Sequence, residues 1–269
     1  MDLIELVNKI SLQEEIKNKV VEYIEANKEV YNLYIDDLIN PHKSEKTYEK
    51  LSQIYEFDNE CIHLLSIYLM SALKVYDKYK IMGISDEIFI STMKCFTRFI
   101  DECKVRTGLY YFDRAWWTHR QVSMRLFRIG ELEYEFDFAE NAISIHIPSD
   151  AILTKNNLLS SLNDWKIFVG KYFNEYCNYK MICSSWLLSP KLKEHLNDGS
   201  RILEFQKLFN IIKINKDDYS FMEWLFKVEK DRKICELPTK TSLQASVKKS
   251  LLNGDYLGSA YGELILDNL

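Results

Sequence analysis

Residues 116–148, WWTHRQVSMRLFRIGELEYEFDFAENAISIHIP, contain the point at which the chain changes from a helical to a strand-like pattern. From residue 132 onward, apolar and acidic residues alternate. The apolar set is Leu132, Tyr134, Phe136 and Phe138, and the acidic set is Glu131, Glu133, Glu135 and Asp137. This period of two predicts a β-strand with one face against a core.

A second strand follows, in which isoleucines at positions 143, 145 and 147 alternate with smaller or polar residues. A hairpin that turns at Ala139 and Glu140 would place the acidic set and His146 on one face of the sheet. Depending on the register, either Glu133 or Glu135 would lie opposite His146. A catalytic pair and an ordinary ion pair on a solvated face would give the same pattern, so both interpretations stay open.

The composition is that of a folded globular protein. Its 269 residues, 47% of them hydrophobic, suffice for one large core or two modest domains. The net charge of −5 and the scattered lysines and arginines argue against a nucleic-acid partner. No apolar run reaches the roughly 18 residues that a membrane span needs, so no membrane association is expected.

The cysteines and histidines indicate a reducing compartment and no metal. Six cysteines without a C-x-x-C spacing predict reduced thiols in a cytoplasmic protein. The N-terminus carries acidic residues and lacks the pattern of a secretory signal. His42, His63 and His195 have no ligand-like neighbours in the sequence, so no metal site is expected. The abundance of lysine, isoleucine and asparagine fits an AT-rich bacterial genome.

Before the hairpin, amphipathic helical patterns recur between short polar breaks. Ser11 and Glu14 have the spacing of a capping box, and Ser85 can cap a later helix. Helices are predicted at about residues 44–54, 58–79, 85–103 and 116–127.

After the hairpin, Thr154 can cap a helix that extends to about Tyr176. The pattern then predicts strands and helices in alternation, and residues 219–227 fit either element. Strands are predicted at residues 181–188, 209–215 and 256–266, and a helix at residues 237–253. This order predicts an α+β protein, with an all-helical domain in residues 1–127 and a mixed α/β sheet domain in residues 128–269.

Several blocks of the sequence resemble a known family, in the expected order. They are WWTHRQVSMRLFRIGELEYEF, ISIHIPSDAILT, ICSSWLLSP, ILEFQKLF and LPTKTSLQASVKKSLLNGDYLGSAYGEL. These blocks resemble bacterial acyltransferase-domain proteins that join a helical N-terminal domain to a GNAT-like C-terminal domain, within the GNAT acyltransferase superfamily. The resemblance implies an acyltransferase, similar to N-acetyltransferases, that uses acetyl-CoA or another acyl-CoA as co-substrate. The acyl group would pass directly to an amine of a small molecule or peptide.

The sequence departs from that pattern at two places. GNAT enzymes bind the pyrophosphate of acyl-CoA with a Q/R-x-x-G-x-G/A loop, and this motif is absent. Relatives carry a histidine shortly before a Ser-Trp pair, where this chain has Ser184 before Ser185 and Trp186. The missing loop favours an alternative, a non-catalytic GNAT-like binding module that has lost its cofactor. The histidine of the hairpin favours the enzyme.

The resemblance implies that acyl-CoA lies along the buried strand at residues 181–188. Pantetheine can hydrogen-bond to such a strand as an additional strand would. The expected cofactor contacts are therefore Cys183, Ser185 and Trp186, for which plain core packing is the alternative.

A turn at Gly199, Ser200 and Arg201 is the candidate phosphate site. It follows a predicted strand and begins a short helix, so free amides and the guanidinium could bind phosphate. An ordinary glycine turn with a serine cap would have the same sequence.

The expected catalytic residues are His146, Glu133 and Tyr176. His146 or Glu133 would take a proton from the amine, since histidine titrates near neutrality and a carboxylate would orient it. Tyr176 would protonate the leaving thiolate, although the same side chain fits the buried stripe of its helix.

Trp117, His119 and Arg128 form an aromatic and basic cluster in the sequence. With Glu135, this cluster would bind the acceptor between the helical domain and the hairpin face. Packing between domains is the alternative role of the cluster.

Overall fold

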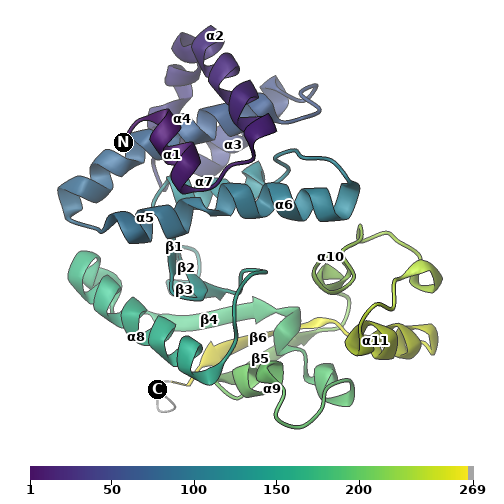
Figure 1. Ribbon diagram of the computed structural model, residues 1–269. Helices are drawn as coiled ribbons and strands as arrows, with labels where there is room; N and C mark the ends of the chain where they lie inside the picture. Colours follow the sequence, from purple (N-terminus) through teal and green to yellow (C-terminus); the bar gives the residue numbers. More distant parts are fainter. Residues whose placement is uncertain (266–269) are drawn as a thin grey trace. The chain divides into compact units, whose positions relative to one another are not determined.

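The computed structural model describes residues 1–265 and divides the chain into two compact units (Figure 1). Unit 1 comprises Met1–Arg128, and unit 2 begins at Ile129. Unit 1 is helical and unit 2 carries a mixed sheet with helices, so the predicted α+β fold class is confirmed. The end of the strand predicted at 256–266 and the end of the predicted sheet domain lie outside the described residues.

Unit 1 is built around α4 (Ile62–Met82), which contacts α1, α2, α5 and α7. Leu64, Leu65 and Ile67 are all buried, so the first half of this helix is buried around its circumference, as expected for a helix at the centre of a unit. The other helices are α1 (Leu3–Lys9), α2 (Glu14–Leu38), α3 (Ser44–Ile54), α5 (Asp86–Met93), α6 (Cys95–Thr107) and α7 (Ala115–Val122).

Local capping explains where some of these helices begin. Ser85 caps α5, and its hydroxyl accepts the amide of Ile88 at 3.4 Å. Ser11 does not cap α2, because it lies in a left-handed turn with a φ of 60° and the helix begins after Gln13. The helix predicted at 85–103 is interrupted at Lys94, which separates α5 from α6.

The helix predicted at 116–127 is too long. α7 ends at Val122, and Met124 then adopts a positive φ of 58°, which stops helical propagation. After Arg125, four residues form the strand β1 (Leu126–Ile129), which is too short to show a recognisable alternation.

The sheet has the strand order β1-β2-β3-β4-β6-β5. The remaining strands are β2 (Leu132–Asp137), β3 (Ala142–His146), β4 (Lys180–Ser185), β5 (Phe209–Asn215) and β6 (Ser259–Leu264). β3 and β4 are parallel, whereas the β2–β3, β4–β6 and β5–β6 pairs are antiparallel. A parallel pair needs a crossover, and α8 (Lys155–Tyr172) supplies it.

α8 lies against one face of the sheet (Figure 1). Thr154 caps it, as the sequence predicts. The Trp165 ring stacks on Tyr134 with 4.6 Å between ring centroids and also contacts Phe136. Because side chains alternate along β2, its acidic residues point to the opposite face.

The segment after β4 differs from the prediction in detail. The predicted strand 181–188 ends at Ser185, and its last three residues form a 3-10 turn, η2 (Trp186–Leu188). The ambiguous stretch 219–227 contains a helix, α10 (Ser220–Leu225), and a capping box of Thr241 and Gln244 begins the helix α11 (Ser242–Leu252). The elements outside the sheet are η1 (Asn174–Tyr176), η3 (Pro190–Glu194), α9 (Arg201–Gln206), α10 (Ser220–Leu225), η4 (Ile234–Glu236) and α11 (Ser242–Leu252).

Candidate active site

The register of the β2–β3 hairpin decides which carboxylate meets His146. Glu133 lies directly opposite His146, and Glu135 lies opposite Ser144. The hydrogen bond nevertheless runs diagonally, with His146 Nε2 at 2.9 Å from Glu135 Oε2. The structure therefore brings together the three residues that the hairpin pattern indicated, and Glu135 is the one bonded to the imidazole.

This face of the hairpin is not solvated. Glu133 is 2% exposed and Glu135 is 6% exposed, whereas His146 is half-buried. Burying a carboxylate is costly unless the group is paired and hydrogen-bonded, which accounts for the Glu135 contact. A half-buried imidazole oriented by a buried carboxylate is the arrangement that a general base requires.

The polar side of the hairpin continues onto three more strands. Ser144 pairs with Ile182 of β4, so Ser184, two residues further along, faces the same side. Ser184 pairs with Tyr261 of β6, and Tyr261 pairs with Lys213 of β5. We call this set the polar face; it comprises Glu133, Glu135, Ser144, His146, Ser184, Tyr261 and Lys213.

β3 and β4 separate at their carboxyl ends. Their pairing stops at Ser144 and Ile182, although β3 continues to His146 and β4 to Ser185. Backbone groups of β4 beyond this point are not paired with β3 and can bind an extended ligand. In open sheets, ligands bind outside the carboxyl ends of parallel strands, and His146 lies at this place.

The side chains predicted to bind cofactor on β4 are mostly occupied. Cys183 is buried on the side opposite the polar face, and burial raises the pKa of its thiol. The Ser185 hydroxyl accepts the amide of Leu187 at 3.1 Å. Trp186 lies in η2 and not on the strand. The backbone of Cys183 and Ser185 is therefore the part of this segment that suits pantetheine.

The predicted phosphate turn has the conformation of a glycine turn with a serine cap. Gly199 has a φ of 81°, and the Ser200 hydroxyl accepts the amide of Ile202 at 3.3 Å. Arg201 is exposed at the start of α9.

A cavity of about 580 Å³ lies beside Gly199. Its walls are largely apolar, and its charged lining residues are two lysines and two acidic residues, with Lys207 paired to Glu204. The lining includes Leu188, Leu203, Phe209, Ile211, Lys193, Lys207, Asp198 and Glu204. A cavity of this size with largely apolar walls suits a ring system.

Tyr176 does not lie near His146. It belongs to η1, and its ring contacts Phe136 with 4.6 Å between centroids. Phe136 points to the α8 side of β2, whereas Glu135 points to the polar face. The prediction that Tyr176 and His146 serve the same reacting atoms is therefore not supported by the geometry.

The cluster predicted to bind the acceptor lies in unit 1. His119 is 1% exposed, bonds through Nδ1 to the Ser44 hydroxyl at 3.0 Å, and stacks on Tyr48. Arg120 lies over the Trp117 ring, with 4.4 Å from its guanidinium carbon to the ring centroid. The backbone amide of Arg128 donates to the Thr92 hydroxyl, and its side chain is half-exposed. His119 thus has the surroundings of an interior side chain.

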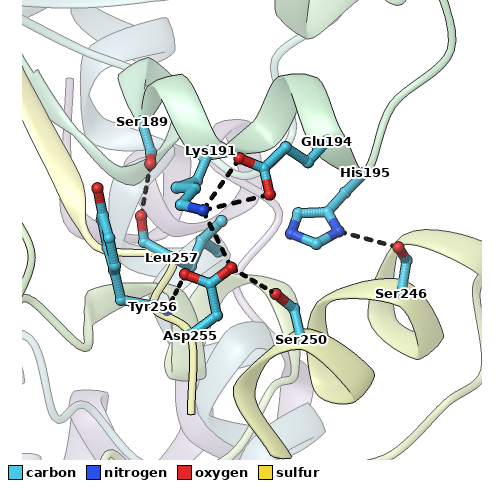
Figure 2. Close-up of polar contacts among 9 residues, drawn as sticks. All are labelled: Ser189, Lys191, Glu194, His195, Ser246, Ser250, Asp255, Tyr256 and Leu257. Atoms are coloured by element: carbon cyan, nitrogen blue, oxygen red, sulfur yellow. Dashed lines mark hydrogen bonds and ion pairs between the residues drawn. The ribbon is translucent and has the colours of Figure 1, made fainter. Parts of the chain in front are cut away.

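Ion pairs and hydrogen bonds connect the segment before β6 to the short helix η3 (Figure 2). Lys191 Nζ lies 3.0 Å from Glu194 Oε1 and 3.0 Å from Asp255 Oδ2, and the Ser250 hydroxyl donates to Asp255. The bonds to Glu194 and Asp255 raise the pKa of Lys191, and the bond from Lys191 lowers the pKa of Asp255. These contacts position the start of β6, the strand that carries Tyr261.

The sequence did not indicate Ser184, Tyr261 or Lys213 as parts of one face. β6 was predicted as a strand, and its alternation of Tyr261 and Glu263 with smaller residues was visible. That alternation gives no information on which strands flank β6 or in which register, so the polar face could not be assembled from sequence.

Residues 1–265 show neither a metal-binding cluster nor a membrane-spanning helix. No group of three or more His, Cys, Asp or Glu side chains there is arranged to hold a metal ion. None of the helices in this part of the chain combines the length and the apolar character that a bilayer crossing needs.

Solved structures of low sequence identity share this fold. The crystal structure of an acyltransferase in complex with decanoyl-CoA and teicoplanin has a TM-score of 0.81 and 19% identity, covering 97% of this chain and 86% of that chain. A complex with CoA and 10C-teicoplanin has a TM-score of 0.81 and 18% identity, covering 97% and 87%. An acyltransferase mutant in complex with octanoyl-CoA has a TM-score of 0.82 and 17% identity, covering 97% and 86%. Among curated proteins, none matches the sequence significantly.

Family comparison accounts for both halves of the chain. Residues 1–124 match the N-acyltransferase N-terminal domain. Residues 126–264, more than half of the chain, match the GNAT-like C-terminal domain. The resemblance found in the sequence is thereby confirmed, and the chain belongs to the N-acyltransferase family that joins this N-terminal domain to a GNAT-like C-terminal domain.

Proposed function

We propose that the protein is an acyl-CoA-dependent N-acyltransferase that transfers an acyl group directly to an amine. The observation that carries this proposal is the His146–Glu135 pair, which lies where the parallel strands β3 and β4 separate. Membership of an N-acyltransferase family and the fold shared with acyltransferases solved with acyl-CoA support the same reaction.

The donor that we propose is an acyl-CoA with a chain longer than acetyl. The acyltransferases of similar fold were solved with decanoyl-CoA and octanoyl-CoA, so these thioesters are the first to test and acetyl-CoA is the second. Pantetheine would bond to the β4 backbone at Cys183 and Ser185. The cavity beside Gly199 would take the nucleotide end, with Lys193 and the nearby Arg201 favouring its phosphates.

Direct transfer requires that the amine lose a proton as it attacks the thioester. His146 would accept this proton, and Glu135 would hold the imidazole in place and stabilise its protonated form. Backbone amides at the separated end of β4 would polarise the thioester carbonyl. Glu133, opposite His146, adds a second negative charge that favours a cationic amine at this face.

The acceptor that we propose is a small molecule. An acyltransferase of similar fold was solved with teicoplanin, which is therefore the first acceptor to test. Trp117 and Arg128 of unit 1 stay candidates for acceptor binding, whereas His119 is buried and bonded to Ser44. A cytoplasmic location in a bacterium stays a prediction from the composition.

Calorimetry and a thiol-release assay test the proposal together. Wild-type protein should bind decanoyl-CoA and release CoA when teicoplanin or another amine is added. His146→Gln should bind the thioester with unchanged affinity and lose turnover, since only the base is removed. Binding without turnover in wild-type protein would refute transfer to the amines tested. No binding at millimolar acyl-CoA would refute the enzyme and favour the non-catalytic module that has lost its cofactor, which the missing glycine-rich loop also favours.

The phosphate turn is tested separately. Arg201→Ala should weaken binding of CoA more than it weakens binding of a decanoyl pantetheine thioester, which lacks the nucleotide. Equal affinity of wild type and variant for CoA would remove Arg201 from the site.

A further inference from the structure

A carboxylate on the side of the sheet that carries His146 has no role in the proposed reaction. Glu263 of β6 lies directly opposite Ile182 of β4, and Ile182 pairs with Ser144 of β3. Residues paired across neighbouring strands point to the same side, so Glu263 shares the side of Ser144 and His146. Its side chain is half-buried, and its carboxylate makes neither an ion pair nor a hydrogen bond within residues 1–265. A carboxylate partly withdrawn from water gains free energy from a partner, which a ligand can supply.

Hydrogen-bonding groups from three strands surround Glu263. Asn210 of β5 lies directly opposite it, and Tyr261 lies two residues away on the same side of β6. Ser184 of β4 lies directly opposite Tyr261. The side chains of Asn210, Tyr261 and Ser184 form no hydrogen bonds in the part of the chain that the structure describes. A carboxylate, an amide, a hydroxyl and an aromatic ring thus lie about 5–7 Å apart and are open to a ligand.

This set of groups suits an alkylammonium ion. An ammonium group has three N–H donors and no acceptor, and Glu263, Asn210 and Ser184 can each accept one hydrogen bond. The face of the Tyr261 ring attracts a cation as well. Lys213, opposite Tyr261 on β5, is exposed and forms no ion pair with Glu263 among residues 1–265. An anionic ligand group would be repelled by Glu263.

The position of His146 sets the length of such a ligand. Glu263 lies two strands away from His146 and two residues further back along the strand direction, so about 12 Å separates their backbones. Three bonds of an extended chain span about 3.5 Å, so a chain of about nine or ten bonds covers this distance. The two terminal nitrogens of 1,8-diaminooctane are separated by about this number of bonds.

We propose that Glu263, with Tyr261, Ser184 and Asn210, binds a second ammonium group of the acceptor, an inference that rests on the proposed function. The acceptor is then a diamine or polyamine. One amine reaches His146 and is acylated, while the other stays protonated at Glu263. This arrangement selects which nitrogen of the acceptor receives the acyl group.

The test compares two acceptors of equal length. 1,8-Diaminooctane carries the second ammonium group, and nonylamine has a methyl group at the same place. With decanoyl-CoA as donor, kcat/KM of the wild type should be about 10-fold higher for the diamine, a typical effect of hydrogen bonding between charged groups. In Glu263→Gln, which keeps the shape and removes the charge, this ratio should fall below about 2.

Glu236→Gln is the matched control. It makes the same change in η4, where Glu236 is exposed and lies 3.1 Å from Arg232, and it should keep the wild-type ratio. Spermidine and glycyl-lysine amide, which have similar spacings between their terminal nitrogens, distinguish a free polyamine from a peptide as the source of the diamine. Higher kcat/KM for either than for nonylamine supports the inference, and for neither would overturn it.

Each remaining outcome decides one point. A ratio near 1 in wild type, or an unchanged ratio in Glu263→Gln, would overturn the inference and leave the proposed function standing. If Glu263→Gln does not fold, wild type with diamines of four, eight and twelve carbons decides: the highest kcat/KM at eight carbons supports the inference, and equal values overturn it. A wild-type protein that binds decanoyl-CoA but acylates no amine would overturn the proposed function, and the inference with it.

Discussion

The contact between Glu135 and His146 makes a quantitative prediction about catalysis. The perturbation is Glu135→Gln, which keeps the shape of the side chain and removes its charge. The side chains of His146 and Glu135 are 23% and 8% exposed, and 2.9 Å separates Nε2 from Oε2. A hydrogen bond to a charged group at such a site contributes about 1.5–3 kcal/mol. Because about 1.36 kcal/mol changes a rate tenfold, kcat should fall roughly 10- to 150-fold.

The assay must separate positioning of the base from binding and folding. We expect the KM for decanoyl-CoA to change by less than about twofold, because Glu135 acts through His146 and the interaction forms in the transition state. The melting temperature should change little, since a glutamine of equal volume can still bond to the imidazole and a buried charge is lost. Thiol release at saturating acceptor gives kcat, and thermal unfolding gives the melting temperature.

Glu140→Gln is the matched control for this prediction. It makes the same change of charge at the hairpin turn, where the side chain is 56% exposed and lies 3.9 Å from Lys180. Its kcat should equal that of wild type, because exposed ion pairs contribute little. If Glu135→Gln kept kcat within twofold while His146→Gln lost it, the carboxylate would have no orienting role and the reasoning from the hairpin contact would be wrong.

The remaining predictions concern stability. Gly258→Ala should lower the free energy of unfolding by more than about 1–3 kcal/mol, because φ is +65° and an added Cβ would lie 2.4 Å from Asn215 O; Gly83→Ala, with φ of +72° and open space, is the control in denaturant unfolding. Thr241→Ala removes the capping box of α11 and should cost about 1 kcal/mol, whereas Thr239→Ala, in the segment before it, should cost less than about 0.5 kcal/mol. Burial lowers the pKa of His195, so the unfolded chain binds a proton more readily than the folded one and stability should fall as the pH drops below 6.5. His195→Gln should lose that part of the pH dependence in thermal unfolding between about pH 5 and 7.5, and an unchanged profile would contradict the assignment.

The sequence was sufficient to predict most helices and strands, but less sufficient to predict the residues at which they begin and end. The alternation of the hairpin and the caps at Ser85 and Thr154 were read correctly, because each depends on residues within a few positions of one another. β1 and η2 were missed, since segments of three or four residues hold too few periods to be recognised. At Ser11 the sequence predicts a cap that the structure lacks. Its spacing to Glu14 fits a capping box, but Ser11 has a left-handed backbone conformation and does not cap α2.

The candidate site could be predicted only in part, because it depends on contacts between strands that are far apart in the sequence. A period of two identifies the residues that share a face of one strand, and this was sufficient to group Glu133, Glu135 and His146. It does not identify which tyrosine shares that face. Tyr176 is closer to His146 along the chain, yet the register places Tyr261 on the polar face and Tyr176 against Phe136.

The His146–Glu135 contact favours the enzyme over the binding module. Glu135 is almost completely buried, and burying a carboxylate is costly. Ligand binding alone does not require an imidazole held by a buried carboxylate. A general base does require one, because the carboxylate orients the imidazole and stabilises its protonated form during the reaction. The pair also lies at the separated ends of β3 and β4, where an acyl-CoA along β4 would meet an amine.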